Sequence, residues 1–415
     1  MTARYSAARA AGSAVARLSR LTGRGGGTHV GGRVTLAIDP GALARAAAGR
    51  ELALVSGTNG KTTTRTLLVA ALGTVAPVVS NGGGANLPPG LTVALTADRA
   101  SRLGVLEVDE PFLPRVIEAV RPRAVVLLNL SRDQLDRYAE VRRLAGIWRD
   151  ALAAPDAPLA VANADDPLVV WAASTAREAV WVGAGQRWTF DSTSCPECGD
   201  VLVRADTGRG WRSPGCGLSR PEPGWTVDGR TVRTSDGTSY DVELSIPGDV
   251  NVGNAAMAAA AAGLWGVPPA AAFDAMAAIP SVEGRYLQTA YAGRQVRLLL
   301  AKNPAGWVEA LEMSRPDAPT VVAVNARAAD GRDPSWLWDV PFELLRGRQA
   351  VATGERSRDV AVRLRYAGVE HTRVDDPAQA LRAAAGLAGP AADAPVEVLA
   401  NYTAFQGYRA VVEDG

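Results

Sequence analysis

Lysine is nearly absent from this chain of 415 residues. Of its 44 basic residues, only Lys61 and Lys302 are lysine, and every other one is arginine. The two cations are nearly exchangeable on a solvated surface, so a lysine that persists under such a bias indicates a need for a compact ammonium on a flexible stem. We therefore expect both lysines to serve a site, with chance retention as the alternative for Lys302.

Other absences exclude whole classes of protein. No apolar run reaches the roughly 18–20 residues that span a bilayer, and the Ala- and Arg-rich start lacks the apolar segment of a secretory signal. The formal net charge is only +1, which gives no large field to attract nucleic acid or an anionic membrane. With 47% hydrophobic residues, we expect a cytoplasmic globular protein without a transmembrane segment or a nucleic-acid partner.

Short apolar strands alternate with helices in the middle of the chain. This pattern predicts a parallel sheet covered by helices on both faces, and therefore an α/β fold. The expected strands lie at 52–55, 104–108, 124–128 and 158–161, and the expected helices at 62–72, 111–120 and 138–153.

Shifts in composition divide the chain into three parts, as its length also suggests. We assign 1–46 to an N-terminal helical segment, 47–283 to a central domain, and 284–415 to a smaller C-terminal α/β domain. Residues 186–245 are rich in Gly, Ser, Pro and Cys in short alternating segments. They indicate a β-rich module inserted in the central domain.

A glycine-containing loop between the strand at 52–55 and the helix at 62–72 predicts a phosphate site. Its glycines let successive backbone N–H groups converge on an anion at the positive end of the helix. Lys61 would reach the β- and γ-phosphates of ATP, and the Thr62 hydroxyl would bind Mg²⁺, although the loop is shorter than the usual Walker loop. The expected phosphate-binding residues are Gly57, Thr58, Asn59, Gly60, Lys61, Thr62 and Thr63.

The segment Gly57–Thr64 resembles the nucleotide loop of the Mur ligases and the folylpolyglutamate synthases. Later segments resemble further motifs of that family in the same order, which makes coincidence a poor explanation. These segments are Asn129–Tyr138, Asn163–Pro167, Asn251–Ala255 and Gly284–Arg285. The resemblance implies a Mur ligase-like central domain with a parallel sheet and an ATP site.

By this resemblance, Glu107 aligns with the glutamate that binds Mg²⁺ in Mur ligases. An acidic residue at the end of a strand in a doubly wound sheet suits that role. Neighbouring Asp109 and Glu110 are candidate helpers, with a solvated helix N-terminus as the alternative. Gln134 stands where the amino-acid-adding enzymes have a histidine that binds a second Mg²⁺, which leaves the number of Mg²⁺ ions open.

The resemblance also implies the rest of the nucleotide site. Asn251 and Asn254 match a pair near the adenine, with helix capping as the alternative. Arg285 matches the arginine that begins the last domain. Lys302 falls where related enzymes contact the nucleotide from the C-terminal domain, so domain closure would complete the site and exclude water.

Three segments of the last domain resemble the MurT subunits of lipid II isoglutaminyl synthases. They are Lys302–Gly306, Ala329–Asp339 and Asn401–Ala404. The resemblance implies ATP-dependent amidation, through an acyl phosphate, of the D-glutamate α-carboxylate in the peptidoglycan stem peptide. The acceptor would be lipid II or a soluble muropeptide, and a lipid-linked acceptor would place the enzyme at the inner face of the plasma membrane.

The groups needed for glutamine hydrolysis are missing from the sequence. Neither His29 nor His371 has a nucleophile beside it, so no catalytic Cys–His pair is visible. Ammonia must come from solution or from another chain, and the resemblance implies a GatD-like glutaminase subunit in a heterodimer. Asp333 would act in trans on the Cys–His pair of that subunit, with a turn residue as the alternative.

Two rival functions stand beside this one. The first is an amino-acid-adding Mur or folylpolyglutamate-type ligase, against which Gln134 and the segment 330–336 argue. The second is a silent scaffold for the glutaminase. A silent site has no reason to keep Lys61, Thr62 and Glu107.

The three cysteines lie in the expected β-rich module. Cys195 and Cys198 have the spacing of a zinc knuckle, and Cys216 resembles the second half of a zinc ribbon. A structural Zn²⁺ needs four ligands, but this chain has Arg212–Gly215 where MurT relatives carry a fourth cysteine. Three thiolates with water or a carboxylate such as Asp200 would still hold metal, and a ribbon stabilised by packing alone is the alternative. A disulfide is not expected in the cytoplasm.

Overall fold

The computed structural model describes residues 3–21, 28–132, 141–205, 210–282, 284–387 and 394–414. The chain forms two compact units. The first comprises Met1–Leu130, Val141–Ser245 and Val250–Ile279, and the second Ser131–Glu140, Ile246–Asp249 and Pro280–Gly415. None of the described helices combines the length and the apolar composition needed to pass through a bilayer.

Three helices begin the first unit: α1 (Ala3–Leu21), α2 (Thr28–Ile38) and α3 (Ala42–Ala47). The sequence indicated an N-terminal helical segment over 1–46 but gave no separate sign of α2, whose glycines are poor helix formers. Tertiary packing explains the helix, because α2 contacts both α1 and α5 (Pro88–Ala97). A Cβ on Gly31 would lie 2.7 Å from the carbonyl oxygen of Gly12, and one on Gly32 would lie 2.0 Å from that of Pro89. The glycines therefore permit close approach of the helices.

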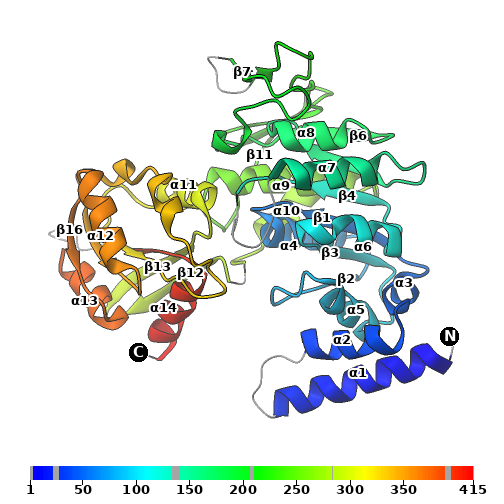
Figure 1. Cartoon of the computed structure of the whole chain (residues 1–415), viewed down its shortest axis with the longest axis horizontal. Helices are drawn as coiled ribbons and strands as arrows, with labels where there is room; N and C mark the ends of the chain where they lie inside the picture. Colours follow the sequence, from blue (N-terminus) through cyan, green and yellow to red (C-terminus); the bar gives the residue numbers. More distant parts are fainter. Residues whose placement is uncertain are drawn as a thin grey trace. The chain divides into compact units, whose positions relative to one another are not determined.

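A nine-stranded sheet forms the centre of the first unit (Figure 1). Its order is β11-β10-β9-β6-β5-β4-β1-β3-β2, and the strands from β6 to β2 are parallel. These six are β1 (Glu51–Ser56), β2 (Val78–Ser80), β3 (Leu103–Glu107), β4 (Ala124–Leu127), β5 (Leu159–Asn163) and β6 (Ala179–Gly183). The topology confirms the predicted α/β class.

Helices cover the sheet and bury its apolar strands. On one face, α6 (Leu113–Val120), α7 (Val141–Leu152) and α8 (Pro167–Ala173) pack side by side (Figure 1). Trp148 of α7 is fully buried there, against Leu54 and Leu127 among others in one apolar cluster. The remaining helices of the unit are α4 (Lys61–Leu72), which packs against α10 (Pro269–Ala277), and α9 (Asp249–Gly263).

The expected β-rich module divides into two parts in the structure. One part holds the small pair β7 (Val203–Arg204) and β8 (Trp211–Arg212) beside the cysteines. The other part, β9 (Trp225–Asp228), β10 (Thr231–Thr234) and β11 (Ser239–Asp241), continues the large sheet. β9 pairs in parallel with β6, and the three strands then form an antiparallel meander.

The second unit is built on a six-stranded sheet of order β12-β13-β17-β14-β15-β16. Only the β12–β13 pair is antiparallel. Trp307 and Phe342 fill the core on one face of the sheet, and Phe405 and Tyr408 fill it on the other. The strands are β12 (Tyr286–Tyr291), β13 (Arg294–Leu300), β14 (Thr320–Ala323), β15 (Gln349–Thr353), β16 (Glu370–Arg373) and β17 (Val396–Ala400). The helices are α11 (Pro304–Met313), α12 (Ser357–Tyr366), α13 (Pro377–Leu387) and α14 (Tyr402–Asp414).

Candidate active site

The predicted phosphate loop lies where the strand order of the large sheet reverses. β3 and β2 lie on one side of β1, and β4, β5 and β6 lie on the other. In doubly wound sheets, ligands bind beyond the carboxyl ends of the strands at such a switch point. The loop that joins β1 to α4, residues 57–60, leaves the sheet at this point, between the ends of β3 and β4.

Both glycines of the loop are required by backbone conformation and by space. The φ angle is 143° at Gly57 and 83° at Gly60, in a region that L-residues rarely adopt. A Cβ on Gly57 would lie 2.8 Å from the Cβ of Leu128, and one on Gly60 would lie 2.6 Å from Oδ1 of Asn254. Neither position tolerates a side chain without rearrangement.

Asn129, which follows β4, holds the middle of the loop. The backbone N–H of Thr58 donates to the Asn129 carbonyl oxygen at 2.9 Å. The N–H of Asn59 donates to Oδ1 of Asn129 at 2.9 Å, and the Asn129 amide donates back to the Asn59 carbonyl at 3.1 Å. The loop is thereby fixed before α4, whose N-terminus carries the positive end of the helix dipole. Residues 133–138 of this motif, including Gln134, lie outside the described residues.

Lys61 is buried and folded back onto the loop. Its Nζ donates to the carbonyl oxygens of Gly57 at 2.5 Å and Thr58 at 3.3 Å, and it lies 3.2 Å from Oε1 of Glu110. Both charged residues are almost inaccessible, at 5% and 7% exposure. Burial raises the pKa of Glu110, and the ammonium of Lys61 opposes this. The ammonium therefore lies at the phosphate loop, held by two carbonyl oxygens and one carboxylate, where it can contact a bound phosphate.

Thr62 and Glu107 come from different elements and meet beside the loop. The Thr62 hydroxyl donates to Oε2 of Glu107 at 2.9 Å, and Nε of Arg65 lies 3.7 Å from the same oxygen. Asn81, just after β2, binds the Glu107 backbone in both directions, at 3.0 Å to its carbonyl and 2.9 Å from its N–H. Asn81 was not predicted as a site residue. The one signal in the sequence is its position directly after a short apolar run.

Of the two asparagines of α9, Asn254 contacts the helix that begins at the loop. Oδ1 of Asn254 accepts from the Thr64 hydroxyl at 3.2 Å, and its amide donates to Oδ1 of Asn251 at 3.1 Å. Asn254 is buried, and its oxygen occupies the space beside Gly60. The structure therefore places Asn254 beside the phosphate loop, and Asn251 contacts Asn254.

Lys302 and Arg285 lie in the second unit, at one edge of its sheet. Lys302 follows the carboxyl end of β13, and Asn303 caps the next helix by accepting from the N–H of Gly306 at 2.9 Å. The Arg285 carbonyl accepts from the N–H of Leu300 at 3.1 Å, so Arg285 flanks the same strand end. The shared edge is consistent with a common role.

Asp333 is exposed on the loop after β14. One of its carboxylate oxygens accepts from the backbone N–H of Ser335 and the other from the Ser335 hydroxyl, both at 2.9 Å. These bonds hold the pKa of Asp333 below its usual range, so the group stays ionised. These hydrogen bonds hold Asp333 against the residues that follow it, and they leave the carboxylate at the surface.

Asp330, three residues earlier, anchors this loop and was not singled out by sequence reasoning. It is 5% exposed and accepts from the N–H of Thr403 at 2.8 Å and from its hydroxyl at 2.5 Å. Asn325 donates to the Thr403 hydroxyl at 3.0 Å, and Asn401 donates to the Asn325 carbonyl at 2.7 Å. Two segments that resembled separate family motifs thus form one polar network at the ends of β14 and β17.

The three cysteines converge in the ribbon part of the β-rich module. Their Sγ atoms all lie within 4.8 Å of one another. Burial raises the pKa of the Cys195 thiol, but hydrogen bonds from Ser213 and from backbone N–H groups outweigh it and lower the pKa to about 7. The group Cys195, Cys198 and Cys216 is suited to binding a metal ion.

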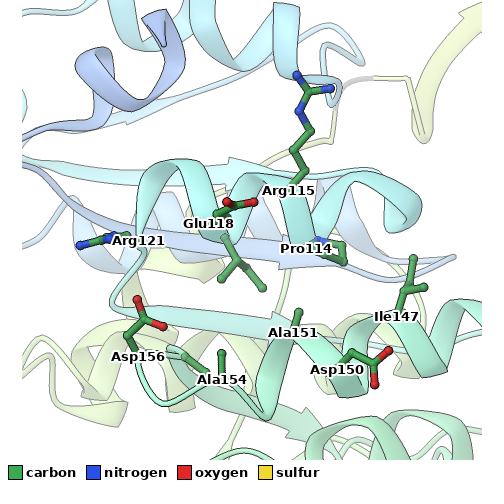
Figure 2. Close-up of a pocket in the computed structure, with 11 residues that line it drawn as sticks. Pro114, Arg115, Glu118, Arg121, Ile147, Asp150, Ala151, Ala154 and Asp156 are labelled. Carbon is green, nitrogen blue, oxygen red and sulfur yellow. The ribbon is translucent and has the colours of Figure 1, made fainter. Parts of the chain in front are cut away.

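A cavity of about 520 Å³ opens elsewhere on the first unit, between α6 and α7 (Figure 2). Arg121 and Asp156, which line it, precede β4 and β5. The cavity therefore lies toward the amino ends of these strands, whereas the phosphate loop lies at the carboxyl end of β1. We assign no step of the chemistry to it.

Comparison with known families assigns most of the chain. The profile of the Mur ligase middle domain matches residues 55–205, which include the phosphate loop and Glu107. The profile of the MurT ligase C-terminal domain matches residues 300–405, which include Lys302 and Asp333. The first profile lies within the first unit apart from residues 131–140, and the second profile lies within the second unit.

Similar proteins support both matches. The chain is 29% identical over 391 residues to the MurT subunit of the glutamine-hydrolysing lipid II isoglutaminyl synthase of Streptococcus pneumoniae, covering 86% of each chain. It is also 29% identical over 379 residues to the corresponding subunit of Staphylococcus aureus, covering 85% of this chain and 86% of that one. The fold is similar to that of a pseudomurein peptide ligase type C from Methanothermus fervidus, with a TM-score of 0.69 and 20% identity over 88% of this chain and 79% of that chain. The chain therefore belongs to the Mur ligase family, within its MurT branch.

Proposed function

We propose that this chain is the ATP-dependent synthetase subunit of a lipid II isoglutaminyl synthase. It would transfer the γ-phosphoryl group of ATP to the α-carboxylate of D-glutamate in the stem peptide, and ammonia would displace phosphate to leave D-isoglutamine. The observation that carries the proposal is an intact phosphate loop, with buried Lys61 and the Thr62–Glu107 pair, in a chain similar to MurT subunits over 86% of its length.

The phosphate loop supports the first half of this reaction. A carboxylate is a poor electrophile, so it must be phosphorylated before ammonia can attack it. Catalysis of this phosphoryl transfer depends on positioning the reactants and neutralising the charge on the phosphates. The fixed loop backbone and Lys61 supply both for the phosphates of ATP. Thr62 and Glu107 would hold Mg²⁺, since a hydroxyl and a carboxylate are the oxygen ligands that this ion prefers. Bound there, Mg²⁺ would neutralise charge on the phosphates.

Four further residues would contact the nucleotide. Asn251 and Asn254 would lie near the adenine, and Arg285 and Lys302 would contact the nucleotide from the C-terminal unit. Their shared strand end supports the last two roles. Exclusion of water around the activated carboxylate would protect it from hydrolysis.

Asp333 supports a partner that supplies ammonia. It is an exposed, ionised carboxylate on a loop whose base is anchored by Asp330. A carboxylate that orients the histidine of a Cys–His pair needs both properties, charge and access. We propose that a GatD-like glutaminase binds here in a heterodimer, and that a lipid-linked acceptor brings the complex to the inner face of the plasma membrane.

The cysteine cluster supports a structural role for metal. Thiolates prefer Zn²⁺ among the common divalent ions of cells. Convergence of three Sγ atoms from two separate turns suits an ion that ties these turns together. We propose that Cys195, Cys198 and Cys216 bind Zn²⁺, away from the reacting groups.

One assay tests the main proposal. The chain is purified with a glutaminase subunit and incubated with Mg²⁺-ATP, glutamine and lipid II, and mass spectrometry follows the conversion of carboxylate to amide. A parallel reaction replaces glutamine and the partner with ammonium. We expect amide in both reactions and in neither with Lys61→Ala. Ligation of an added amino acid in place of amidation would instead establish the rival ligase function, and partner-dependent glutamine hydrolysis without ATP turnover would establish the scaffold.

A further inference from the structure

The two turns that carry the cysteines are built alike. In the first, Cys195 is followed by a proline and Cys198 by Gly199, whose φ is 85°. In the second, Ser213 is followed by a proline and Cys216 by Gly217, whose φ is 77°. Left-handed glycines at matching places close both turns with the same shape.

The hydrogen bonds of the two turns match as well. The N–H of Cys195 donates to the carbonyl of Asp200 at 2.7 Å, and the N–H of Ser213 donates to the carbonyl of Leu218 at 2.7 Å. Each bond joins the first residue of a turn to the residue five positions later. By this correspondence, Ser213 occupies in the second turn the position that Cys195 occupies in the first.

Burial follows the same correspondence. Cys195 and Ser213 are each 2% exposed, whereas Cys198 and Cys216 are exposed. The buried Ser213 hydroxyl faces the sulfurs: its Oγ lies 3.2 Å from Sγ of Cys198 and 3.5 Å from Sγ of Cys216. A hydroxyl so deeply buried and in contact with two of the three thiols is placed as a member of their group.

The spacing suits a tetrahedral ion. With zinc–sulfur bonds of about 2.3 Å, ligand atoms around a tetrahedral Zn²⁺ lie about 3.8 Å apart, and slightly less when one is oxygen. Sγ of Cys195 and Sγ of Cys216 are 3.5 Å apart, and the Oγ–Sγ distances of Ser213 are similar. Small movements would bring all four atoms to bonding distance of one ion.

Asp200, the carboxylate considered from the sequence, is placed differently. Its Oδ2 fills the space beside Gly215, where a Cβ would lie 2.0 Å away. Among the described His, Cys, Asp and Glu side chains, the metal-binding group at this ribbon consists of the three cysteines without Asp200. The carboxylate therefore packs over the second turn.

We propose that Ser213 is the fourth ligand of the ribbon, so that the metal is held by three thiolates and one serine oxygen. This inference rests on the metal site proposed above and is independent of the amidation reaction. A neutral hydroxyl binds Zn²⁺ more weakly than a thiolate, so the site binds metal less tightly than one with four cysteines. Ser213→Cys completes the thiolate set and strengthens binding.

Metal titration of the full chain tests the role of Ser213. Zn²⁺ affinity is measured against a chromophoric chelator, and Co²⁺ is used as a second probe because its visible spectrum reports ligand number and thiolate content. We expect one ion per chain and a tetrahedral Co²⁺ spectrum. Ser213→Ala should weaken Zn²⁺ binding by about ten-fold or more and change the Co²⁺ spectrum, whereas Ser213→Cys should tighten binding and strengthen the sulfur-to-cobalt absorption.

Two controls separate the possible failures. Ser219→Ala removes an exposed hydroxyl of the same ribbon and should change neither measurement. Asp200→Asn tests the rival ligand. Unchanged Zn²⁺ affinity and an unchanged Co²⁺ spectrum in Ser213→Ala would overturn the role of Ser213 but not the metal site. Loss of Zn²⁺ binding in Asp200→Asn but not in Ser213→Ala would lead to the same conclusion. A wild-type chain and a Ser213→Cys chain that both fail to bind Zn²⁺ would overturn the metal site itself.

Discussion

The ammonium of Lys61 lies 3.2 Å from the carboxylate of Glu110, and both groups are buried beside the phosphate loop. Breaking such a buried ion pair by removing one of its two charges typically costs about 3–5 kcal/mol. We expect Glu110→Gln to lower Tm, and Mg²⁺-ATP to raise Tm more in the variant than in the wild type, because phosphates give Lys61 a new partner. Thermal unfolding with and without nucleotide measures both effects. Glu118→Gln, on the exposed face of α6, is the matched control; an equal nucleotide shift in wild type and Glu110→Gln would contradict the idea.

Gly60 offers a test of the loop geometry. Gly60→Ala forces a left-handed conformation on an L-residue, at about 1–2 kcal/mol, and drives its Cβ against Oδ1 of Asn254. We expect nucleotide binding to fall by at least about ten-fold, as the two costs together imply. Isothermal titration with an ATP analogue measures this. Gly263→Ala, at the end of the same helix as Asn254 and with open space around it, should bind nucleotide as the wild type does.

The Thr62–Glu107 contact predicts where Mg²⁺ acts. Glu107→Gln keeps the side-chain shape but removes the charge that would hold the ion. We expect kcat to fall by on the order of a hundred-fold and the Mg²⁺ concentration for half-maximal ATP turnover to rise. Asn81→Ala removes the two hydrogen bonds that hold the Glu107 backbone. We expect it to raise the Mg²⁺ requirement with a smaller loss of kcat than Glu107→Gln causes. If Glu107→Gln left the Mg²⁺ requirement unchanged, the ion would have to lie elsewhere.

A substitution at Asp333 should affect amidation from glutamine and amidation from free ammonium differently. Asp333→Asn removes the charge proposed to orient the partner's histidine, while the ATP site keeps every group. We expect glutamine-dependent amidation to fall by about 10⁴-fold at most, the loss known for a triad aspartate, and ammonium-dependent amidation to be unchanged. Asp359→Asn, another exposed aspartate of the same unit, serves as the control. Equal losses with both nitrogen sources would point to a structural role.

The hydrogen bonds between Ser335 and Asp333 allow a prediction about the pKa of Asp333. The bonds from Ser335 depress the pKa of Asp333, so the ionised form is favoured in the folded chain. Ser335→Ala removes the hydroxyl bond, and the pKa should rise toward its usual value of about 3.9. Asp333 then becomes protonated at a higher pH as acid is added, yet it stays ionised at neutral pH. NMR titration of the carboxyl carbons measures the shift, and an unchanged pKa would show that the backbone N–H alone sets it.

Much of the fold is readable from local sequence. β1, β3, β4 and β5 are short apolar runs buried on both faces, and each lies within a few residues of its predicted position. The phosphate loop was equally accessible, because residues 57–63 are contiguous and act through their own backbone. The comparisons confirm the family that these residues indicated. Roles of individual residues such as Arg285 and Lys302 stay predictions.

Elements that depend on distant packing escaped the sequence. α2 contains adjacent glycines and exists because α1 and α5 cover it. β2 has three residues, too few for a pattern. The meander β9–β11 appeared to belong to a separate module, yet β6 extends the large sheet into it. The pairing of a strand with the edge of a sheet leaves no pattern in the local sequence, because it depends on which sheet edge is free in the folded chain.

Only the tertiary structure decided which side chains meet. Asn81 binds a residue 26 positions away, Lys61 pairs with one 49 positions away, and Asp330 holds one 73 positions away. Ser213 faces the cysteines because its turn folds against the turn that carries Cys195 and Cys198. The sequence by itself determined the local conformations and the chemistry of the phosphate loop. Strand order and register, which no short segment encodes, determined which side chains contact the residues of that loop.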